Sequence, residues 1–322
     1  MKKLLTILSS LCITFVYAQQ DPMYTQYMFN TLAINPAYAG SRDVLSATLL
    51  YRHQWLIQGA PRTLTFSADM PIANEKVGVG LVVTNDNIGV FNTVGATANF
   101  AYRIRFEKTT LAFGILAGFS QITANLPDVG LTNDVAFAQA QNHFVPNVGA
   151  GIYWSSDKFY IGASLPKMLN TSLYASLPEL PPSASNGFRA RQFRHAFITG
   201  GYVFDLSDHV KLKPSTLIRF VSGAPAQIDL NCNLYLYERF GIGLSARSAA
   251  QIGAINSLVG LFSSPSILLE FQATDQFKIG YAFDYNTGIQ NFSGISNVMS
   301  HELMVRYEMG FNKAKVLSPR YF

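Results

Sequence analysis

The feature that most constrains this chain is a two-residue alternation of apolar and polar side chains along several long segments. From residue 93 to residue 106, the even positions from Val94 to Phe106 are apolar or small, whereas most odd positions are polar. Successive side chains of a β-strand point to opposite faces of its sheet, so the pattern predicts strands with one apolar and one polar face. These segments are roughly 10 to 14 residues long, where most strands of globular proteins have five or six.

Long two-faced strands are typical of a transmembrane β-barrel, whose lipid-facing side is apolar, whose lumen is polar and whose closure leaves no unpaired edge. Only 13% of the 322 residues are charged, about half the usual share in a soluble domain. We therefore predict an all-β fold, a transmembrane antiparallel β-barrel of about 14 strands spanning residues 44–311. The expected strands are 44–56, 62–71, 76–85, 93–107, 110–123, 145–155, 158–165, 193–206, 209–222, 225–237, 239–248, 256–273, 276–286 and 299–311.

A large soluble β-sandwich would also show alternating strands. The strand lengths, the low charge and the aromatic residues near the ends of apolar faces, such as Tyr51 and Trp55, favour the barrel. The strand expected at 256–273 is the weakest of the set, because Ser263, Ser264, Pro265 and Ser266 interrupt it and could divide it in two.

Connections between the expected strands alternate between tight polar turns and longer segments, as in bacterial barrels. The longer connections are 86–92, 124–144, 166–192, 249–255 and 287–298. Both ends of the barrel sequence fall on the side of the tight turns, which predicts that the mature N-terminus and the C-terminal tail, residues 312–322, lie in the periplasm.

The first 18 residues have the pattern of a secretory signal peptide. Lys2 and Lys3 precede an apolar run over residues 4–16, and Ala18 offers a small residue before Gln19, the expected mature start. A membrane anchor is the alternative, but the run is shorter than the roughly 20 residues that span a bilayer. An exported barrel of this kind belongs in the outer membrane of a Gram-negative cell.

Chemistry-bearing motifs are sparse. The five histidines are dispersed, and no pair has metal-ligand spacing. Nucleotide-binding loops and hydrolase signatures are absent from the sequence. We predict no catalytic residue, no metal, no cofactor and no nucleic-acid partner, although an enzyme whose residues converge at a barrel rim stays open as an alternative.

Residues 19–43 differ from the strands, being rich in aromatic side chains and methionine without alternation. Asp21 as a cap and Pro22 at the first helical position predict a short helix over 22–32. This segment is expected either to plug the barrel or to form a belt that seals its periplasmic side. Alternatively, it forms a docking surface for periplasmic partners, and one segment could serve both purposes.

The residues DPMYTQYMFN at 21–30 and NPAYAGS at 35–41 resemble the opening signature of the PorP/SprF family of type IX secretion membrane proteins. The resemblance covers the mature chain, although from about 124 to 275 it lies mainly in the pattern, and the stretch 249–266 is longer than the family's usual hairpin. Further similar segments are RHQW at 52–55, GAP at 59–61 with Thr63, NDNIG at 85–89, YRI at 102–104, YAFDY at 281–285, SHEL at 300–303 and SPRYF at 318–322.

This resemblance implies a non-enzymatic outer-membrane barrel of the type IX secretion and gliding apparatus. Such a barrel would bind, help to export or anchor surface proteins, including adhesins and cargo with a type B C-terminal sorting domain. The implied partners are that cargo protein, other secretion components at the periplasmic face, and outer-membrane lipid. A diffusion porin or small-solute transporter is the alternative, since a barrel of this size can enclose an open lumen.

The motif residues supply the candidate partner-binding site, and the long connections 124–144 and 166–192 supply the expected cargo-facing surface. Trp55 could instead anchor the barrel at the membrane interface. The candidate residues are Tyr24, Tyr27, Phe29, Asn35, Pro36, Tyr38, Gln54, Trp55, Pro61, Asp86 and Phe322.

Overall fold

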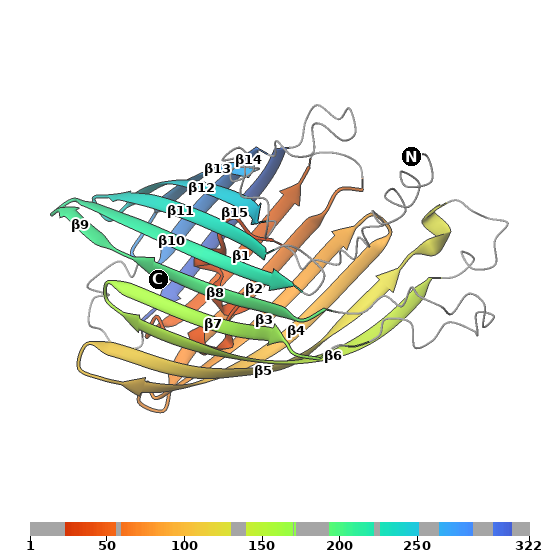
Figure 1. The fold of residues 1–322 in the computed structure, drawn as a ribbon, viewed down its shortest axis with the longest axis horizontal. Coiled ribbons are helices and arrows are strands. Elements are labelled where there is room, and N and C mark those ends of the chain that lie inside the picture. The colour runs from red at the N-terminus through yellow and green to blue at the C-terminus, as the bar shows by residue number, and fades with distance from the viewer. Residues whose placement is uncertain are drawn as a thin grey trace, which may run out of the picture.

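The computed structural model describes residues 23–55, 59–129, 140–169, 171, 193–221, 226–250, 264–285 and 299–310. Over these residues the chain forms one antiparallel sheet that closes into a barrel (Figure 1). The expected signal peptide, the mature start, the C-terminal tail and Phe322 lie outside the described residues. The strands are β1 (Leu45–Gln54), β2 (Arg62–Ile72), β3 (Val77–Ile88), β4 (Phe91–Arg105), β5 (Thr109–Ala124), β6 (Gln141–Ser156), β7 (Phe159–Lys167), β8 (His195–Tyr202), β9 (Phe204–Ser207), β10 (Val210–Val221), β11 (Ala226–Leu236), β12 (Phe240–Ala250), β13 (Ser264–Gln272), β14 (Phe277–Tyr285) and β15 (Met299–Met309).

Closure follows from the pairing of the first and last strands, since β1 pairs with both β15 and β2. The strands β8 and β9 both pair with β10 and occupy one position in the barrel. The barrel therefore has 14 positions, which confirms the predicted fold and strand number. The single strand expected at 193–206 is interrupted at Val203, which is buried against Tyr235, and the ladder to β10 shifts its register between Val210 and Lys211.

The two faces of the barrel differ as the alternation predicts. Large apolar side chains point outward and remain exposed, among them Leu244 at 65% and Ile115 at 62% of full exposure. Inward-facing neighbours on the same strands are buried and mostly polar or charged, such as Arg52, Asn99 and Asp229. Such an arrangement is stable in lipid and unfavourable in water, so the outer face is the membrane-facing side.

Three of the longer connections differ from the expectation. The one expected at 124–144 is shorter, because β6 already begins at Gln141. The connection predicted at 86–92 is a two-residue turn, Gly89–Val90, because β3 continues to Ile88 and β4 begins at Phe91. The polar residues that suggested a loop lie on the paired strands, where Asn92 Nδ2 donates a hydrogen bond of 2.9 Å to Asn85 Oδ1. The turn suits glycine, since Gly89 has a φ of 58°.

The connection expected at 249–255 begins later, because β12 continues to Ala250. At the start of β13, Ser264, Pro265 and Ser266 belong to the strand, and Pro265 pairs with Ala246. Within the described part, Ser264 to Ser266 are thus the start of a strand and not an interruption. Proline fits near a strand's first residue, where the ladder has little to lose from a missing N–H. Residues 251–263, which include the rest of the strand expected at 256–273, lie outside the described residues.

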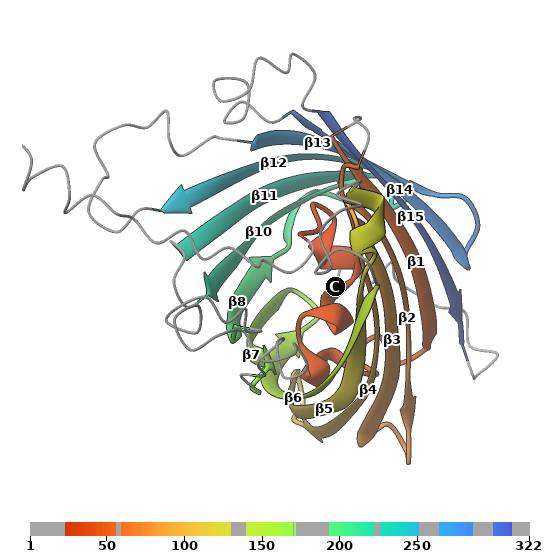
Figure 2. The same ribbon diagram turned by 90° about the vertical axis from the view of Figure 1, so that its right-hand side faces the viewer.

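The segment before β1 lies inside the barrel, where it forms the turns drawn within the strands in Figure 2. It contains the short 3₁₀-helices η1 (Tyr27–Phe29), η2 (Thr31–Ala33) and η3 (Pro36–Tyr38), and a further one, η4 (Leu126–Val129), follows β5. The one short helix predicted over 22–32 is wrong for its described part, because the chain forms two separate 3₁₀-helices there, η1 and η2. The backbone N–H groups of Thr25 and Gln26 bond to the barrel carboxylate of Glu302 rather than within a helix. Within the described ranges, no helix is long and apolar enough to cross a membrane.

The membrane-facing surface predicts a depth-dependent cost for charge. Ile115 lies in the middle of the outward face of β5, so Ile115→Arg should lower the free energy of unfolding by about 2–4 kcal/mol. The matched control is Leu206→Arg, which places the same charge near a tight turn, where the cost should be about 0–1 kcal/mol. Urea unfolding of the protein folded into lipid vesicles measures both, and equal costs would contradict the assigned membrane face.

Candidate functional site

The candidate site is the segment at residues 23–44, here called the lumen segment, together with the barrel wall that it contacts. From Tyr24 to Arg42 nearly every side chain is buried, although the segment has no sheet of its own. It starts against β14, β15 and β1, crosses to β5–β7, and returns past β2 and β3 to enter β1. The barrel interior is thus occupied by the chain's own N-terminal part (Figure 2).

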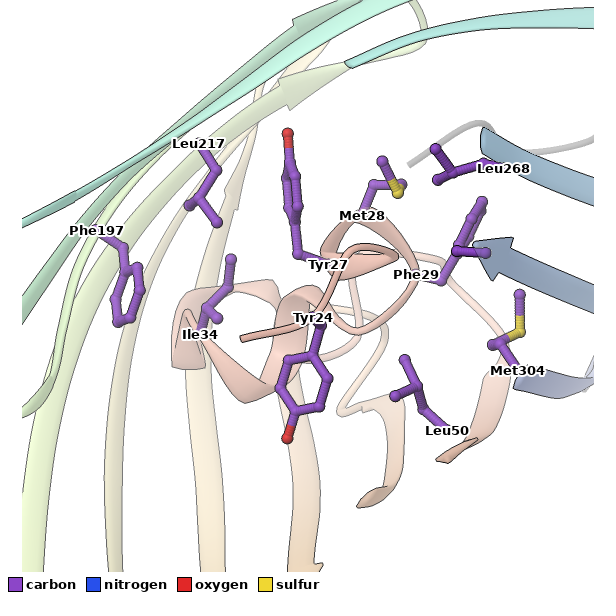
Figure 3. Packing of buried hydrophobic residues seen from close by; sticks show 11 residues of the cluster. Tyr24, Tyr27, Met28, Phe29, Ile34, Leu50, Phe197, Leu217, Leu268 and Met304 are labelled. Atoms are coloured by element: carbon purple, nitrogen blue, oxygen red, sulfur yellow. The ribbon is translucent and has the colours of Figure 1, made fainter. Parts of the chain in front are cut away.

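Apolar packing provides the first set of contacts. In Figure 3 the lumen-segment side chains Tyr24, Tyr27, Met28, Phe29 and Ile34 spread outward from the central turns toward the wall. Because these aromatic and aliphatic groups are exposed to less than a tenth of their surface, their burial favours the docked state of the segment. The wall residues that complete the cluster are Leu50, Phe197, Leu217, Leu268, Ala282 and Met304.

A buried charge cluster holds the start of the segment. Arg52 of β1 forms ion pairs of 2.7 Å with Asp284 of β14 and 3.0 Å with Glu302 of β15. The Thr25 hydroxyl donates to Asp284 Oδ2 at 2.7 Å, and the backbone N–H groups of Thr25 and Gln26 donate to Glu302 at 3.0 and 2.7 Å. The carboxylates are thus satisfied jointly by a barrel cation and by the lumen segment, as buried charges require.

Cations of β12 and β15 bond to backbone carbonyls of the same stretch. Arg247 of β12 pairs with Asp229 at 2.7 Å and donates to the Tyr24 carbonyl at 3.2 Å. Arg306 of β15 donates to the Phe29 carbonyl and lies 5.5 Å from the centre of the Phe29 ring. Lys278 also lies over that ring, at 5.7 Å, so cation–π contacts accompany the hydrogen bonds.

The middle of the segment is fixed by Asn35. Its side-chain Nδ2 donates to the carbonyl of Ile152 in β6 at 3.0 Å, while its Oδ1 accepts from the Ala37 N–H at 3.0 Å and caps η3. Pro36 occupies the first turn of η3, where its missing N–H costs nothing. One asparagine therefore both begins a local turn and attaches it to the wall.

Tyr38 continues this attachment through stacked aromatic rings. The Tyr38 ring packs edge-on against Tyr153 of β6, with 5.4 Å between the ring centres. Tyr153 in turn stacks on Tyr160 of β7 at 5.8 Å. The three rings fill the lumen between the segment and the β6–β7 wall.

Burial also determines the protonation state of two tyrosines of the lumen segment, Tyr24 and Tyr27. Desolvation raises the pKa of Tyr24 and the pKa of Tyr27 above the ordinary value. Both phenols therefore stay protonated at neutral pH. Tyr24 Oη shares a 2.6 Å hydrogen bond with Thr65 of β2, and Tyr27 Oη accepts one of 3.0 Å from Asn231 of β11.

Glycines in the wall make room for the lumen segment. A Cβ atom at Gly114 of β5 would overlap the backbone at Ala37, and one at Gly78 of β3 would overlap the Ala39 carbonyl. At Gly151 of β6 a Cβ atom would meet the Asn35 side chain in the same way. The wall is therefore hollowed along the path of this particular segment.

The segment leaves the lumen at the tight-turn end through further polar contacts. The Gly40 N–H donates to Asp69 of β2 at 2.8 Å, and Arg42 pairs with Glu308 of β15 at 2.6 Å. Asp43 accepts from Arg103 of β4 at 2.6 Å. Both ends of the lumen segment are thus held by charge, with its apolar groups between them.

The structure brings together four of the other candidate residues at the long-connection rim. The Gln54 N–H donates to the Pro61 carbonyl at 2.9 Å, and Asp86 accepts from Thr63 at 2.6 Å. Trp55 follows with a φ of 53° and donates its N–H to Ser300 at 3.4 Å. Segments far apart in the sequence therefore meet at this rim, where β1 and β3 end and β2 and β15 begin.

The candidate residues thus fall into two groups. Tyr24, Tyr27, Phe29, Asn35, Pro36 and Tyr38 contact the lumen wall, whereas Gln54, Trp55, Pro61 and Asp86 lie at the rim. Phe322 lies outside the described residues. Their roles as partner contacts stay predictions, because all of these contacts join residues of the same chain.

Sequence reasoning missed the residues that hold the lumen segment: Arg52, Asp284, Glu302, Arg247 and the wall glycines. A usable signal existed, because Arg52, Asp284 and Glu302 are lumen-facing charges that each lie within a family-like motif.

The chemistry of this arrangement is that of peptide binding, through ion pairs, hydrogen bonds and ring contacts. Across the described part of the chain, no group of three or more His, Cys, Asp or Glu side chains could hold a metal ion.

Comparisons with known proteins agree with these motifs. The family model described as type IX secretion system membrane protein PorP/SprF matches residues 16–307. No curated protein matches the chain significantly.

Solved structures with similar folds include a KdgM porin, at 11% identity and a TM-score of 0.36, covering 82% of this chain and 99% of the porin. The CymD monoaromatic hydrocarbon channel matches at 9% identity and a TM-score of 0.48, covering 91% of this chain and 95% of the channel. At these values the similarities carry no information on what this chain binds or conducts.

Filling the wall at Gly114 should expel the lumen segment. In Gly114→Ala the new methyl group meets backbone that cannot move aside, so trypsin should cleave the folded barrel after Arg42, which is buried in the wild type. The matched control, Gly200→Ala in β8, has its nearest neighbour at 3.5 Å and should stay protected. The mass of the fragments identifies the cleavage site, and heat-dependent gel mobility shows whether the barrel is folded. A folded Gly114→Ala barrel in which Arg42 stays protected from trypsin would contradict the role of Gly114 in admitting the lumen segment.

Removing Arg52 should be among the costliest polar changes. Arg52→Ala leaves two buried carboxylates without their cation and should cost about 3–5 kcal/mol in unfolding free energy, because uncompensated buried charge is unfavourable. The control Arg105→Ala removes a 39%-exposed cation from the tight-turn rim and should cost at most about 1 kcal/mol. Urea unfolding followed by tryptophan fluorescence compares them, and a cost below that of Arg105→Ala would refute the anchoring role.

Proposed function

Because the chain belongs to the PorP/SprF family of type IX secretion system membrane proteins, we propose that it is a non-enzymatic outer-membrane barrel that binds surface proteins and helps to export or anchor them. The cargo class is a surface protein, such as an adhesin of the gliding apparatus, with a type B C-terminal sorting domain. Residues 1–18 act as a cleaved signal peptide in this proposal, as exported barrels require.

The single observation that carries the proposal is the occupied lumen. The lumen segment is fixed by ion pairs, backbone hydrogen bonds and ring contacts around Arg52, Asn35 and Arg42. A barrel whose interior is committed to its own chain is suited to presenting surfaces at its rims rather than to passing solutes through its centre. This supports a protein-binding role over a diffusion pore.

The rims supply the surfaces for that role. At the long-connection end, β6 projects past β7, since their pairing begins only at Ala150. Phe144 on this projecting part is 67% exposed and stacks on Phe119 with 5.2 Å between ring centres. We assign cargo binding to this end together with the connections 130–139 and 172–192, and assign contacts with other secretion components to the tight-turn end, facing the periplasm.

The test is capture of cargo from the native outer membrane. A tagged wild-type protein, extracted in mild detergent, should recover a large surface protein with a C-terminal sorting domain. Replacing residues 130–139 and 172–192 by short Gly-Ser linkers should abolish recovery, whereas the same replacement of residues 251–263, another connection at that end, should not. Mass spectrometry identifies the cargo, and a folded wild-type barrel without any protein partner would contradict the proposal.

A conductance measurement addresses the porin alternative. In planar bilayers the wild-type barrel should give little ion conductance, because the lumen segment fills its interior, and the Gly114→Ala barrel should give more. A high wild-type conductance, unaffected by Gly114→Ala, would favour a diffusion porin or small-solute transporter over the proposed role.

A further inference from the structure

A polar cluster interrupts the apolar outer face of the barrel where β15, β1 and β2 reach the long-connection end. Arg62 of β2 pairs across the ladder with His53 of β1, and His53 pairs with His301 of β15. These residues continue the outward-facing rows that contain Leu64, Leu49 and Leu303, all of which are strongly exposed. The cluster therefore lies at the edge of the membrane-facing band, at the depth of lipid headgroups.

Hydrogen bonds organise this cluster. Arg62 Nε donates to His53 Nε2 at 3.4 Å, and Tyr281 Oη shares a 2.6 Å hydrogen bond with His301 Nδ1. The contact with Arg62 leaves Nδ1 of His53 to carry its ring proton when the imidazole is neutral. The guanidinium of Arg62 uses only its Nε–H group in this contact. Its other N–H groups and the ring N–H of His53 therefore lie close together as hydrogen-bond donors on one patch of the outer surface.

Carboxylates that could neutralise the patch are directed elsewhere. Asp86, Asp284 and Glu302 lie at the same height, but on the lumen face of their strands, where they accept from Thr63, Thr25 and the lumen segment. The neighbouring connections, residues 56–60 and 286–298, contain no Asp or Glu in their sequence. A cationic patch thus faces the membrane with no acidic residue from these elements beside it.

Aromatic side chains border the patch on its membrane side. Tyr51 and Tyr281 both pair with Leu303, one step toward the membrane from His301, and are exposed to 41% and 37%. Tyrosine with an apolar ring and a polar tip is suited to the boundary between acyl chains and headgroups. A phosphate group at this boundary would meet N–H donors while its acyl chains cover the apolar band below.

We propose that the Arg62–His53–His301 patch binds the phosphate of an anionic, phosphorylated glycolipid headgroup in the outer leaflet. This inference rests on the proposed outer-membrane orientation. Phosphate matches the charge of the guanidinium and the N–H donors of the imidazoles. Basic clusters at headgroup depth bind anionic lipids in other membrane proteins by the same chemistry.

The experiment titrates the purified wild-type barrel with diphosphoryl lipid A and with dephosphorylated lipid A of the same acyl composition, using native mass spectrometry. The wild type should bind the diphosphoryl form at least tenfold more tightly. The triple variant Arg62→Gln, His53→Gln, His301→Gln should lose that preference at least tenfold, as expected on removing a charged phosphate contact. The matched control, Arg239→Gln, removes an exposed arginine from the tight-turn end and should bind like the wild type.

Equal binding of the two lipids by the wild type, or unchanged preference in a folded triple variant, overturns the inference. Inorganic phosphate in large excess distinguishes a lipid site from a free-ion site, since complete displacement of lipid A by it would assign the patch to the free anion. Cargo capture by the triple variant separates the two proposals. Lost lipid preference with intact capture leaves the proposed function standing, whereas absent capture by the wild type refutes that function without altering the lipid titration.

Discussion

The interaction on which the rest of the structure depends is the joint satisfaction of Asp284 and Glu302 by Arg52 and by the backbone of the lumen segment. It connects the first strand, the last two strands and the segment before them. Without the segment, the carboxylates would retain one cation but lose the donors from Thr25 and Gln26. Because buried charges are stable only when fully hydrogen-bonded, barrel closure and segment docking support each other.

The same dependence explains the composition of the wall. A lumen filled by side chains alone would need large residues facing inward, yet this wall places glycine where the segment passes closest, at Gly78, Gly114 and Gly151. Glycine in a strand loses packing and costs conformational entropy, so its presence there is explained by the backbone that it admits. The lumen segment and the wall glycines are therefore complementary in shape, and each depends on the other for its packing.

The barrel could be predicted from the sequence because its period is local: each strand shows the alternation by itself. Errors arose where polar residues were assigned to a loop, as at Asp86 and Asn87, which extend the β3–β4 hairpin. The site could be predicted only in part. The local sequence pattern identified Tyr24, Asn35 and Tyr38 as candidate site residues. It could not identify their partners, because the partner of Asn35 lies more than a hundred residues away and only the register of the strands brings the two together. The helix expected at 22–32 failed for that reason, since its donors found a carboxylate of β15.

The contact between Thr25 and Glu302 joins residues 277 positions apart. The lumen segment is therefore synthesised long before the strand that supplies its binding partner. Until β15 is in place, an aromatic, methionine-rich peptide remains without the surface that buries it and is exposed to aggregation or to capture by chaperones. Long-range closure of this kind folds slowly. Biogenesis of this barrel is thus a problem of keeping one end of the chain soluble until the other end arrives.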